Sequence, residues 1–341
     1  MNSNIKRPTI KDVAKKSNVS VATVSRIINN LDGYSEETRK KVIKAMDELG
    51  YQRNAIARNL KVKETRTIGV LRPKISTTYY VEILNGIEDF AQRNNYSVII
   101  CNGGDKWERM SEYLQVLSER QVDGLIVCSI PPDDTLCKRI IDSHIPTVLV
   151  SGLSYKYSLP YVKVDDYQAA YSATSYLIEN GHKEIAIISG PTEDPIAGVP
   201  RLNGFLQALR DNNISIKKNL IKEKGFGFID GVEGMNELLK TGEKFTAVFA
   251  ASDDCAVGAL SVAHKNGLKV PDDLSIVGYD NTNIAEMSYP PLTTVAQPLY
   301  DMGKKSVEML IKRISYNEKV ESIIMPFEII ERETVKKIKD I

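Results

Sequence analysis

Small, apolar and hydrogen-bonding side chains share one face of a predicted helix near the N-terminus of this 341-residue chain. Residues 9–30, TIKDVAKKSNVSVATVSRIINN, predict two short helices around a turn at Ser17-Asn18, with Ser20 capping the second helix. Its outer face carries Val21, Ala22, Ser25, Arg26 and Asn29. Such groups suit contact with base edges in the DNA major groove. An ordinary helical hairpin packed in a core is the alternative that this segment alone leaves open.

Further motifs follow this segment in a fixed order along the chain. They are Thr9-Ile10-Lys11-Asp12-Val13-Ala14, Val19-Ser20, Thr23-Val24-Ser25-Arg26, Ser35-Glu36-Glu37-Thr38-Arg39-Lys40-Lys41-Val42, Leu49-Gly50-Tyr51, Asn54-Ala55-Ile56-Ala57-Arg58-Asn59-Leu60, Gly278-Tyr279-Asp280 and Thr293-Thr294-Val295-Ala296-Gln297-Pro298. An isolated helix-turn-helix is a weak signal, but this ordered set spans nearly the whole chain. It resembles the LacI/GalR family of bacterial repressors, and Val21-Ala22 before Thr23-Val24-Ser25-Arg26 is similar to the catabolite-control branch of that family.

The resemblance implies a DNA-reading role for the second helix. Val21 and Ala22 fall where family members select their operator, and both can touch thymine methyl groups. Arg26 is expected to fork onto a guanine. Contacts with phosphate or sugar, which fix the register on DNA, are implied for Thr9, Ser20, Thr23, Ser25, Asn29 and Arg39.

A hinge helix at about residues 54–61 is also implied by the resemblance. In the family this helix orders on DNA and inserts a leucine, here Leu60, into the minor groove. Ala57 is small enough for two hinge helices to approach each other closely. Arg53 stands where the family usually has proline, which pre-sets the backbone at a helix start. Its presence predicts either less favourable folding of the hinge or an added phosphate contact.

A ligand pocket is the third feature that the resemblance implies. Effector-facing positions of the family are matched by Tyr79, Tyr80, Arg201, Ser252, Asp253, Asp280 and Gln297. Two carboxylates, a guanidinium and an amide suit the hydroxyl groups of a neutral sugar, and a tyrosine ring offers a flat face for stacking. Ser252 stands where many members have asparagine, and Ser151 stands where some have aspartate. A purine remains an alternative ligand. A phosphosugar is less expected, because its phosphate would face the carboxylates of Asp253 and Asp280 with only Arg201 to offset them.

Beyond the first 60 residues, short apolar runs alternate with segments of helical periodicity. The predicted strands are Ile68–Leu71, Ser97–Cys101, Gly124–Cys128, Thr147–Val150, Ile185–Ser189, Ala247–Ala251 and Ser275–Tyr279. Predicted helices include Glu82–Arg93, Arg109–Arg120, Gln168–Asn180, Asn203–Asn212 and Asp254–Asn266. This alternation is typical of buried parallel sheets, either one large sheet or two smaller ones.

The resemblance selects two sheets. It implies an all-α helix-turn-helix headpiece at residues 1–60, a linker at 61–67, and at 68–341 an α/β core of two doubly wound parallel-sheet subdomains, similar to periplasmic binding proteins. The expected subdomain boundaries are about 65–162 with 293–322, and about 163–290 with 323–335. Because the chain has no leucine-heptad tail of the kind with which some members tetramerise, we expect a homodimer on a pseudo-palindromic operator.

Two alternative functions remain open. An α/β enzyme is the first, but no GxGxxG, GxxxxGK[ST] or GxSxG motif is present, and the histidines and cysteines form no cluster that predicts a metal site. Catalytic residues, metals and cofactors are therefore not expected. The second is a catabolite-control regulator whose signal is a phosphorylated carrier protein. Glu308 stands where members of that branch present an arginine to the phosphoserine, and a carboxylate repels phosphate.

Composition and charge fit a DNA-binding protein of the cytoplasm. Residues 1–60 carry 12 Lys and Arg against 6 Asp and Glu, whereas the other residues carry 33 against 38. A basic N-terminal part suits contact with phosphates, although a solvated basic face is the simpler reading of charge alone. No apolar run approaches the roughly 20 residues of a membrane span, and residues 1–10 lack the apolar centre of a signal peptide.

Overall fold

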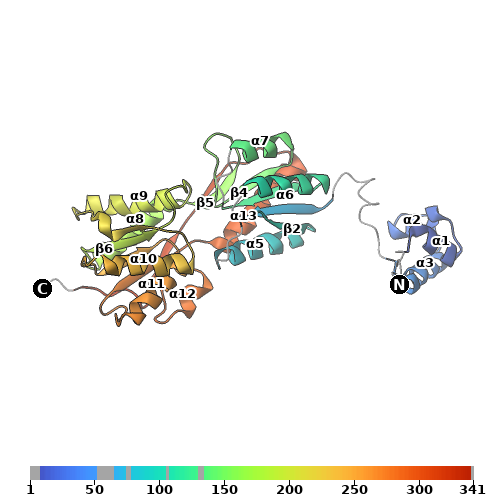
Figure 1. Ribbon diagram of the computed structural model, residues 1–341. Coiled ribbons are helices and arrows are strands. Elements are labelled where there is room, and N and C mark those ends of the chain that lie inside the picture. Colours follow the sequence, from blue (N-terminus) through green and yellow to red (C-terminus); the bar gives the residue numbers. More distant parts are fainter. Residues whose placement is uncertain (1–7, 52–64, 74–77, 105–106, 130–133, 339–341) are drawn as a thin grey trace. The chain divides into compact units, whose positions relative to one another are not determined.

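The computed structural model describes residues 8–51, 65–73, 78–104, 107–129 and 134–338. The chain divides into two compact units at residues 65 and 66 (Figure 1). The first unit contains helices α1 (Ile10–Ser17), α2 (Val21–Ile28) and α3 (Glu36–Leu49), and the second contains two sheets with their covering helices. Among the described residues no helix combines the length and the apolar character that a membrane span requires.

The helices of the headpiece begin and end close to where the sequence predicts. Ser20 Oγ accepts a hydrogen bond of 3.1 Å from the Thr23 backbone N–H and so caps α2, and Ser35 caps α3 in the same way. Gly50 ends α3 in the left-handed conformation, with φ of 62°. The three helices enclose a small apolar core of Val13, Ala14, Val24, Ile27, Val42 and Ala45. The predicted helix-turn-helix is therefore confirmed.

The first sheet of the second unit has six parallel strands in the order β11-β5-β4-β3-β1-β2. Alternate side chains enter different cores: Val70 packs beneath α5 and α13, whereas Leu71 packs beneath α6 and α7. The strands are β1 (Thr67–Arg72), β2 (Ser97–Asn102), β3 (Gly124–Cys128), β4 (Thr147–Val150), β5 (Tyr161–Val164) and β11 (Ile323–Met325), and the helices are α5 (Tyr79–Arg93), α6 (Trp107–Glu119), α7 (Asp134–Asp142) and α13 (Leu299–Tyr316).

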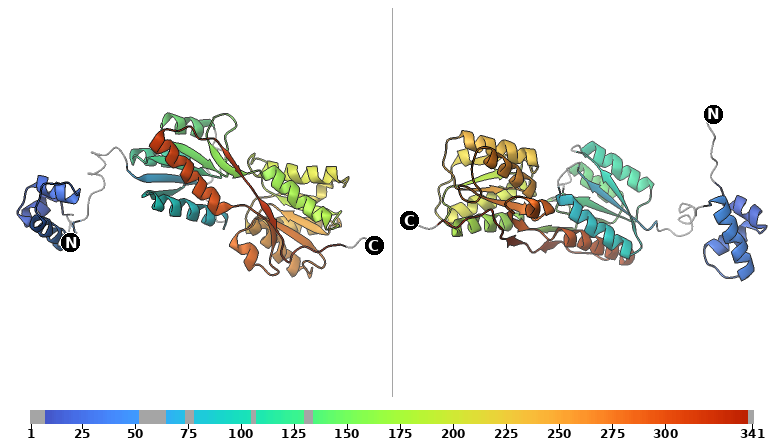
Figure 2. Two further views of the ribbon diagram at one scale, coloured as in Figure 1. Left: turned by 180° about the vertical axis from the view of Figure 1, so that it is seen from behind. Right: turned by 90° about the horizontal axis from the view of Figure 1, so that it is seen from below.

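The second sheet repeats this plan with six strands in the order β12-β10-β9-β8-β6-β7, of which β12 alone runs antiparallel to its neighbour. Helices α8 and α9 cover one face, and α10 and α11 cover the other (Figure 2). The strands are β6 (Ile185–Ser189), β7 (Ile221–Glu223), β8 (Ala247–Ala250), β9 (Ser275–Asp280), β10 (Thr293–Ala296) and β12 (Glu328–Ile330). The helices are α8 (Asp166–Glu179), α9 (Gly198–Asp211), η1 (Lys218–Leu220), α10 (Phe228–Lys240), α11 (Asp253–Lys265) and α12 (Asn283–Met287).

The chain crosses between the sheets three times, after β5, after β10 and after β11. We call the parts around the two sheets the first and second subdomains. Residues 163–164 and 323–325 pair within the first sheet, and residues 293–296 pair within the second. The predicted boundaries are wrong for these three segments, because each segment is a strand whose hydrogen bonds assign it to the sheet across the predicted boundary.

Glycine allows close packing of the helices on the sheets. Gly86 of α5 and Gly303 of α13 face one another's helix, since a Cβ at Gly86 would lie 2.0 Å from the Tyr300 carbonyl oxygen. A Cβ at Gly303 would lie 2.1 Å from the Ile83 carbonyl oxygen. Backbone cannot yield as a flexible side chain does, so these two positions exclude any larger residue. The close α5–α13 contact fixes the start of α5, where Tyr79 lies.

We expect Gly86→Ala to lower the free energy of unfolding of the core by about 3 kcal/mol, because the added methyl group forces α5 away from α13. Asn85→Ala, one residue earlier on the exposed side of the same helix, should change it by less than about 0.5 kcal/mol. Urea unfolding of both variants measures the difference. Equal stability of the two variants would contradict the close packing.

Candidate functional site

The outer face of α2 is available for contact. Val21 is 41% exposed, Ala22, Arg26 and Asn29 are also exposed, and Val24 and Ile27 are buried. The side chain of Arg26 lies over the loop at Gly33, where a Cβ would approach its Nη1 atom to 2.8 Å. This is the division of inner and outer residues that the sequence predicts.

Several residues that the sequence predicts as phosphate contacts also form hydrogen bonds at the starts of helices. Thr9 donates from its backbone N–H and its hydroxyl to Asp12 Oδ2, both at 2.7 Å, at the start of α1. The hydroxyls of Ser20 and Thr23 lie 2.9 Å apart at the start of α2. Unpaired N–H groups at such helix starts suit a phosphate, so capping and DNA contact are compatible roles.

Three further predicted contacts on the headpiece have partners of their own. Asn29 Nδ2 donates to the Ser25 carbonyl oxygen at 2.7 Å, and Arg39 Nη1 lies 3.3 Å from Glu36 Oε1. Both bonds are exposed, so each contributes little to stability. Ala57 and Leu60 lie outside the described residues.

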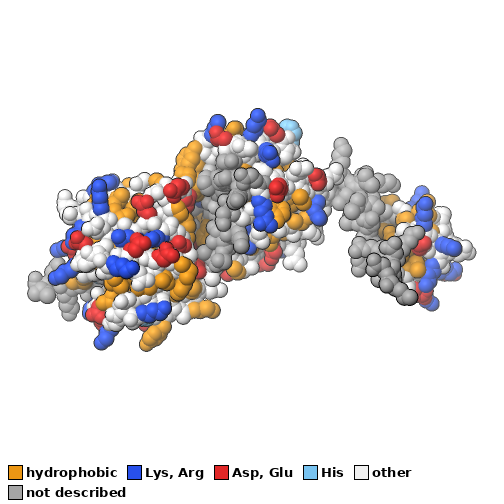
Figure 3. Space-filling model, viewed as in Figure 1, with side chains coloured by type: hydrophobic (Ala, Val, Ile, Leu, Met, Phe, Trp, Pro, Cys, Tyr) orange, Lys and Arg blue, Asp and Glu red, His pale blue; other side chains and the backbone are white. Residues whose placement is uncertain are grey.

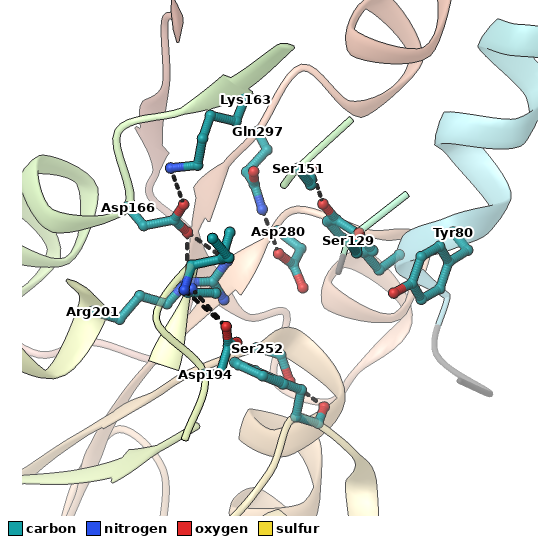
Figure 4. A pocket seen from close by; sticks show the side chains of 14 residues that line it. Tyr80, Ser129, Ser151, Lys163, Asp166, Asp194, Arg201, Ser252, Asp280 and Gln297 are labelled. Carbon is teal, nitrogen blue, oxygen red and sulfur yellow. Dashed lines mark hydrogen bonds and ion pairs between the residues drawn. The ribbon is translucent and has the colours of Figure 1, made fainter. Parts of the chain in front are cut away.

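A pocket in the second unit lies where the strands of both sheets end (Figure 4). It holds about 630 Å³ of space unfilled by protein atoms, part of it open to solvent, a size ordinary for small-molecule sites. Its lining from the first subdomain is Tyr79, Tyr80, Ser129, Ser151 and Lys163. Its lining from the second subdomain is Asp166, Asp194, Ile196, Ala197, Arg201, Phe226, Ser252, Asp280 and Gln297.

Tyrosines form the wall of the first subdomain. The rings of Tyr79 and Tyr80 meet edge to face with their centroids 5.1 Å apart, and the Tyr79 hydroxyl donates to Ser151 Oγ. Burial is the main cause that raises the pKa of both phenols, so both remain neutral donors at physiological pH. An apolar face with a neutral polar tip suits a sugar or another flat polar ring.

A buried guanidinium dominates the wall of the second subdomain. Arg201, on α9, is 5% exposed, and its Cζ atom lies 3.6 Å from the centre of the Tyr279 ring. Its Nε donates to Asp166 Oδ1 at 2.9 Å, and its Nη1 donates to the Ala251 carbonyl oxygen at 2.5 Å. Burial by itself lowers the pKa of Arg201, but the electrostatic interactions with Tyr279, Asp166 and Asp280 raise it overall. The side chain is therefore a fixed, permanent cation.

An acid and an amide lie between these two walls. Gln297 Nε2 donates to Asp280 Oδ1 at 2.7 Å, and both side chains are buried (Figure 4). Burial raises the pKa of Asp280, and the nearby guanidinium of Arg201 opposes that rise. Arg201, Asp280 and Gln297, which the sequence predicts as effector contacts, therefore line one pocket together with Tyr79 and Tyr80.

Asp253 is not in the pocket lining, and its prediction as an effector contact is wrong. The side chain is fully buried, and its Oδ2 accepts from the Thr282 backbone N–H at 2.7 Å and from the Thr282 hydroxyl at 3.1 Å. Its Oδ1 accepts from Thr294 Oγ1 at 2.5 Å. Asp253 thus ties the loop after β9 and the strand β10 to α11, and both of its oxygens are occupied by these bonds.

Ser252 lines the pocket, but its hydroxyl is already used. It donates to the Phe226 carbonyl oxygen at 2.6 Å and accepts from the Cys255 backbone N–H at 3.0 Å, which caps α11. The prediction from sequence missed Lys163, Asp166, Asp194 and Phe226. Lys163 lies within β5, and the other three follow a strand, so a signal existed only where the strand itself was recognised.

Hydrogen bonds also join the two subdomains beside the pocket. Thr78 Oγ1 donates to Asp254 Oδ2 at 3.2 Å, and the Tyr155 hydroxyl donates to the Pro195 carbonyl oxygen at 3.0 Å. Both donors belong to the first subdomain, and both acceptors belong to the second. These bonds favour the arrangement of the subdomains seen here.

Comparison with known proteins divides the chain in the same way. Residues 9–54 match the bacterial regulatory proteins of the lacI family. Residues 65–333 match the family of periplasmic binding proteins and the sugar binding domain of the LacI family.

Individual proteins are similar over almost the full length. Catabolite control protein A of Priestia megaterium is 38% identical over 93% of this chain and 95% of that protein. A solved complex of the transcriptional regulator CelR with cellobiose is 31% identical, with a TM-score of 0.74 over 96% of this chain and all of that one. The lac repressor dimer bound to operator and anti-inducer is 27% identical, with a TM-score of 0.86 over 97% of this chain and all of that one. The chain therefore belongs to the LacI family of bacterial DNA-binding transcriptional regulators.

Proposed function

We propose that this regulator is a homodimeric repressor of carbohydrate-utilisation genes and that a sugar bound between its subdomains sets its affinity for DNA. The observation that carries the proposal is the pocket, whose lining comes from both subdomains and combines aromatic faces with buried hydrogen-bonding groups. A ligand there contacts both subdomains at once. Its binding therefore favours one arrangement of the subdomains over others, by an amount typically of 1–3 kcal/mol.

A neutral mono- or disaccharide, or a related polyol, is the ligand that the lining supports best. Arg201 offers N–H donors, Asp280 offers a carboxyl oxygen, and Gln297 offers an amide that can donate and accept. A sugar hydroxyl therefore finds a partner whether it donates or accepts a hydrogen bond. Phe226 and the two tyrosines supply ring faces for the apolar side of a sugar. A phosphosugar is less well supported, because the three carboxyl groups of the lining (Asp166, Asp194 and Asp280) outnumber its two cations (Arg201 and Lys163).

On DNA, the exposed outer face of α2 is the proposed reading surface, with Arg26 directed at a guanine. One headpiece carries one reading helix, so a pseudo-palindromic operator requires two chains. Action on operator DNA implies a cytoplasmic location for this bacterial regulator. The named lac repressor complex, a dimer on its operator, supports the same arrangement.

Exposed apolar side chains on the core support the second copy of the chain as the dimer partner. Ile229 of α10 is 63% exposed, and Met287 and Tyr289, at the end of α12 and just after it, are 80% and 86% exposed. Figure 3 shows hydrophobic side chains over this part of the surface. Large exposed apolar groups gathered on one face typically mark a contact with another protein.

A phosphorylated carrier protein remains the competing signal. On α13, Glu308 Oε2 lies 2.9 Å from Lys305 Nζ, and a carboxylate at that position repels a phosphoserine. The small ligand is therefore the better supported signal.

We expect binding-site selection from random DNA to return a pseudo-palindrome, and Arg26→Ala to lower discrimination at one guanine of each half-site by about 1–3 kcal/mol. Lys44→Ala, a control on α3 whose side chain is 80% exposed, should leave discrimination unchanged. Anisotropy titrations with matched and substituted operators at one salt concentration measure both. An equal loss on both operators would assign Arg26 to phosphate contact instead.

We expect calorimetry with glucose, cellobiose, ribose, glucose 6-phosphate and hypoxanthine to detect binding of a neutral sugar. Asp280→Asn preserves the shape of the side chain but replaces a carboxyl oxygen with an NH2 donor, and should weaken that binding at least about 10-fold. Asp272→Asn, an exposed control paired with Lys336, should leave it unchanged.

Preference for hypoxanthine or the phosphosugar would contradict the ligand class. Binding of a phosphorylated carrier protein without any small ligand would establish the competing signal.

A further inference from the structure

Asp166 lies at the first position of α8, directly after the chain leaves the first sheet, and it is 5% exposed. Its Oδ1 accepts from Arg201 Nε at 2.9 Å and from the Tyr279 hydroxyl at 3.2 Å, and lies 2.8 Å from Arg201 Nη2. Its Oδ2 lies 2.8 Å from Lys163 Nζ. Both oxygens of this carboxylate are therefore held by cations of the pocket wall.

Two contacts together determine how the Arg201 guanidinium is oriented. Stacking on the Tyr279 ring, at 3.6 Å, fixes the plane of the group. The bonds to Asp166 through Nε and Nη2 fix its rotation within that plane. Figure 4 shows Asp166 between Lys163 and Arg201 at one side of the pocket. A change at Asp166 therefore changes the direction in which Arg201 faces a ligand.

Lys163 belongs to β5 of the first sheet, whereas Asp166 and Arg201 belong to the second subdomain. The Lys163 side chain is only 8% exposed and also donates to the Val164 carbonyl oxygen at 2.8 Å. Its ion pair with Asp166 spans the first crossover between the sheets. The orientation of Arg201 thereby depends on a residue of the other subdomain.

Stability alone does not account for this arrangement. Burying two cations and one anion carries a large desolvation cost, and apolar side chains of similar volume usually stabilise a core as well or better. A fixed orientation of a buried guanidinium, in contrast, is of direct use at a binding site, because a preorganised donor pays no ordering cost when ligand arrives.

Resting on the proposed function, we propose that Lys163 and Asp166 are positioning residues for ligand recognition. Asp166 holds Arg201 toward the ligand, and Lys163 holds Asp166 from the first subdomain. Both residues act on the ligand through Arg201.

A double-mutant cycle tests whether Lys163 acts through Arg201. By calorimetry with the neutral sugar that binds the unaltered protein among glucose, cellobiose and ribose, Lys163→Met should weaken binding about 10-fold. In an Arg201→Lys background the same change should weaken binding less than about 2-fold. Lys156→Met, an exposed lysine of the first subdomain paired with Asp134, is the control and should have no effect. Equal losses in both backgrounds would overturn the proposal.

A second measurement needs no sugar. The Arg201 Nε–H signal, assigned by its loss in Arg201→Lys, should exchange with solvent slowly in the unaltered protein and at least about 10-fold faster in Asp166→Asn and in Lys163→Met. Lys163→Gln, which keeps a donor for Val164 but carries no charge, should behave like Lys163→Met if the apolar variant does not fold. Unchanged exchange in both Lys163 variants would overturn the proposal. If none of the sugars binds, the proposed function fails while this exchange still decides the role of Lys163.

Discussion

Parallel strands all end at one edge of a sheet, and in this core both sheets bring that edge to the same space. This constraint determines which residues form the pocket. Tyr79 follows β1, Ser151 follows β4, Arg201 follows β6, and Asp280 ends β9, although they lie far apart in the sequence. Binding groups of both subdomains therefore meet without any loop that must fold around the ligand, as in other open α/β sheets. The three crossovers connect the two halves of the site.

Much of this fold could be predicted from the sequence, because buried parallel strands appear as short apolar runs. All seven predicted strands are present to within one residue at either end. Five strands were not predicted from their own sequence pattern, for physical reasons. In β5 a lysine interrupts the run, β10 begins with two threonines, and β7, β11 and β12 each have three residues. The subdomain boundaries that the resemblance implied are misplaced at β5, β10 and β11, the strands that adjoin the crossovers.

The site was predicted to a similar degree. Motifs located Arg201, Asp280, Gln297 and the tyrosine pair, all of which line the pocket. Asp253 was predicted from its match to an effector-facing position of the family, which says nothing of side-chain direction. In the structure Ser252 caps α11, and the side chain of the next residue is buried in the core. Lys163 and Asp166 lacked any signal, since a lysine beside acids reads as a solvated surface until the sheet that buries it is known.

The backbone at three of the strand ends limits how this pocket can change. Ser129, Ser151 and Asp280 have φ values of 49°, 51° and 117°, a region in which β-branched side chains are strained. Only glycine and small polar residues are readily accommodated there, so substitutions at these positions can change the shape of the pocket only slightly. Tyr80 and Phe226 also line the pocket, and neither is among the residues with positive φ. The shape of the pocket is therefore easier to change by exchanging the ring side chains at such positions than by altering the strand ends.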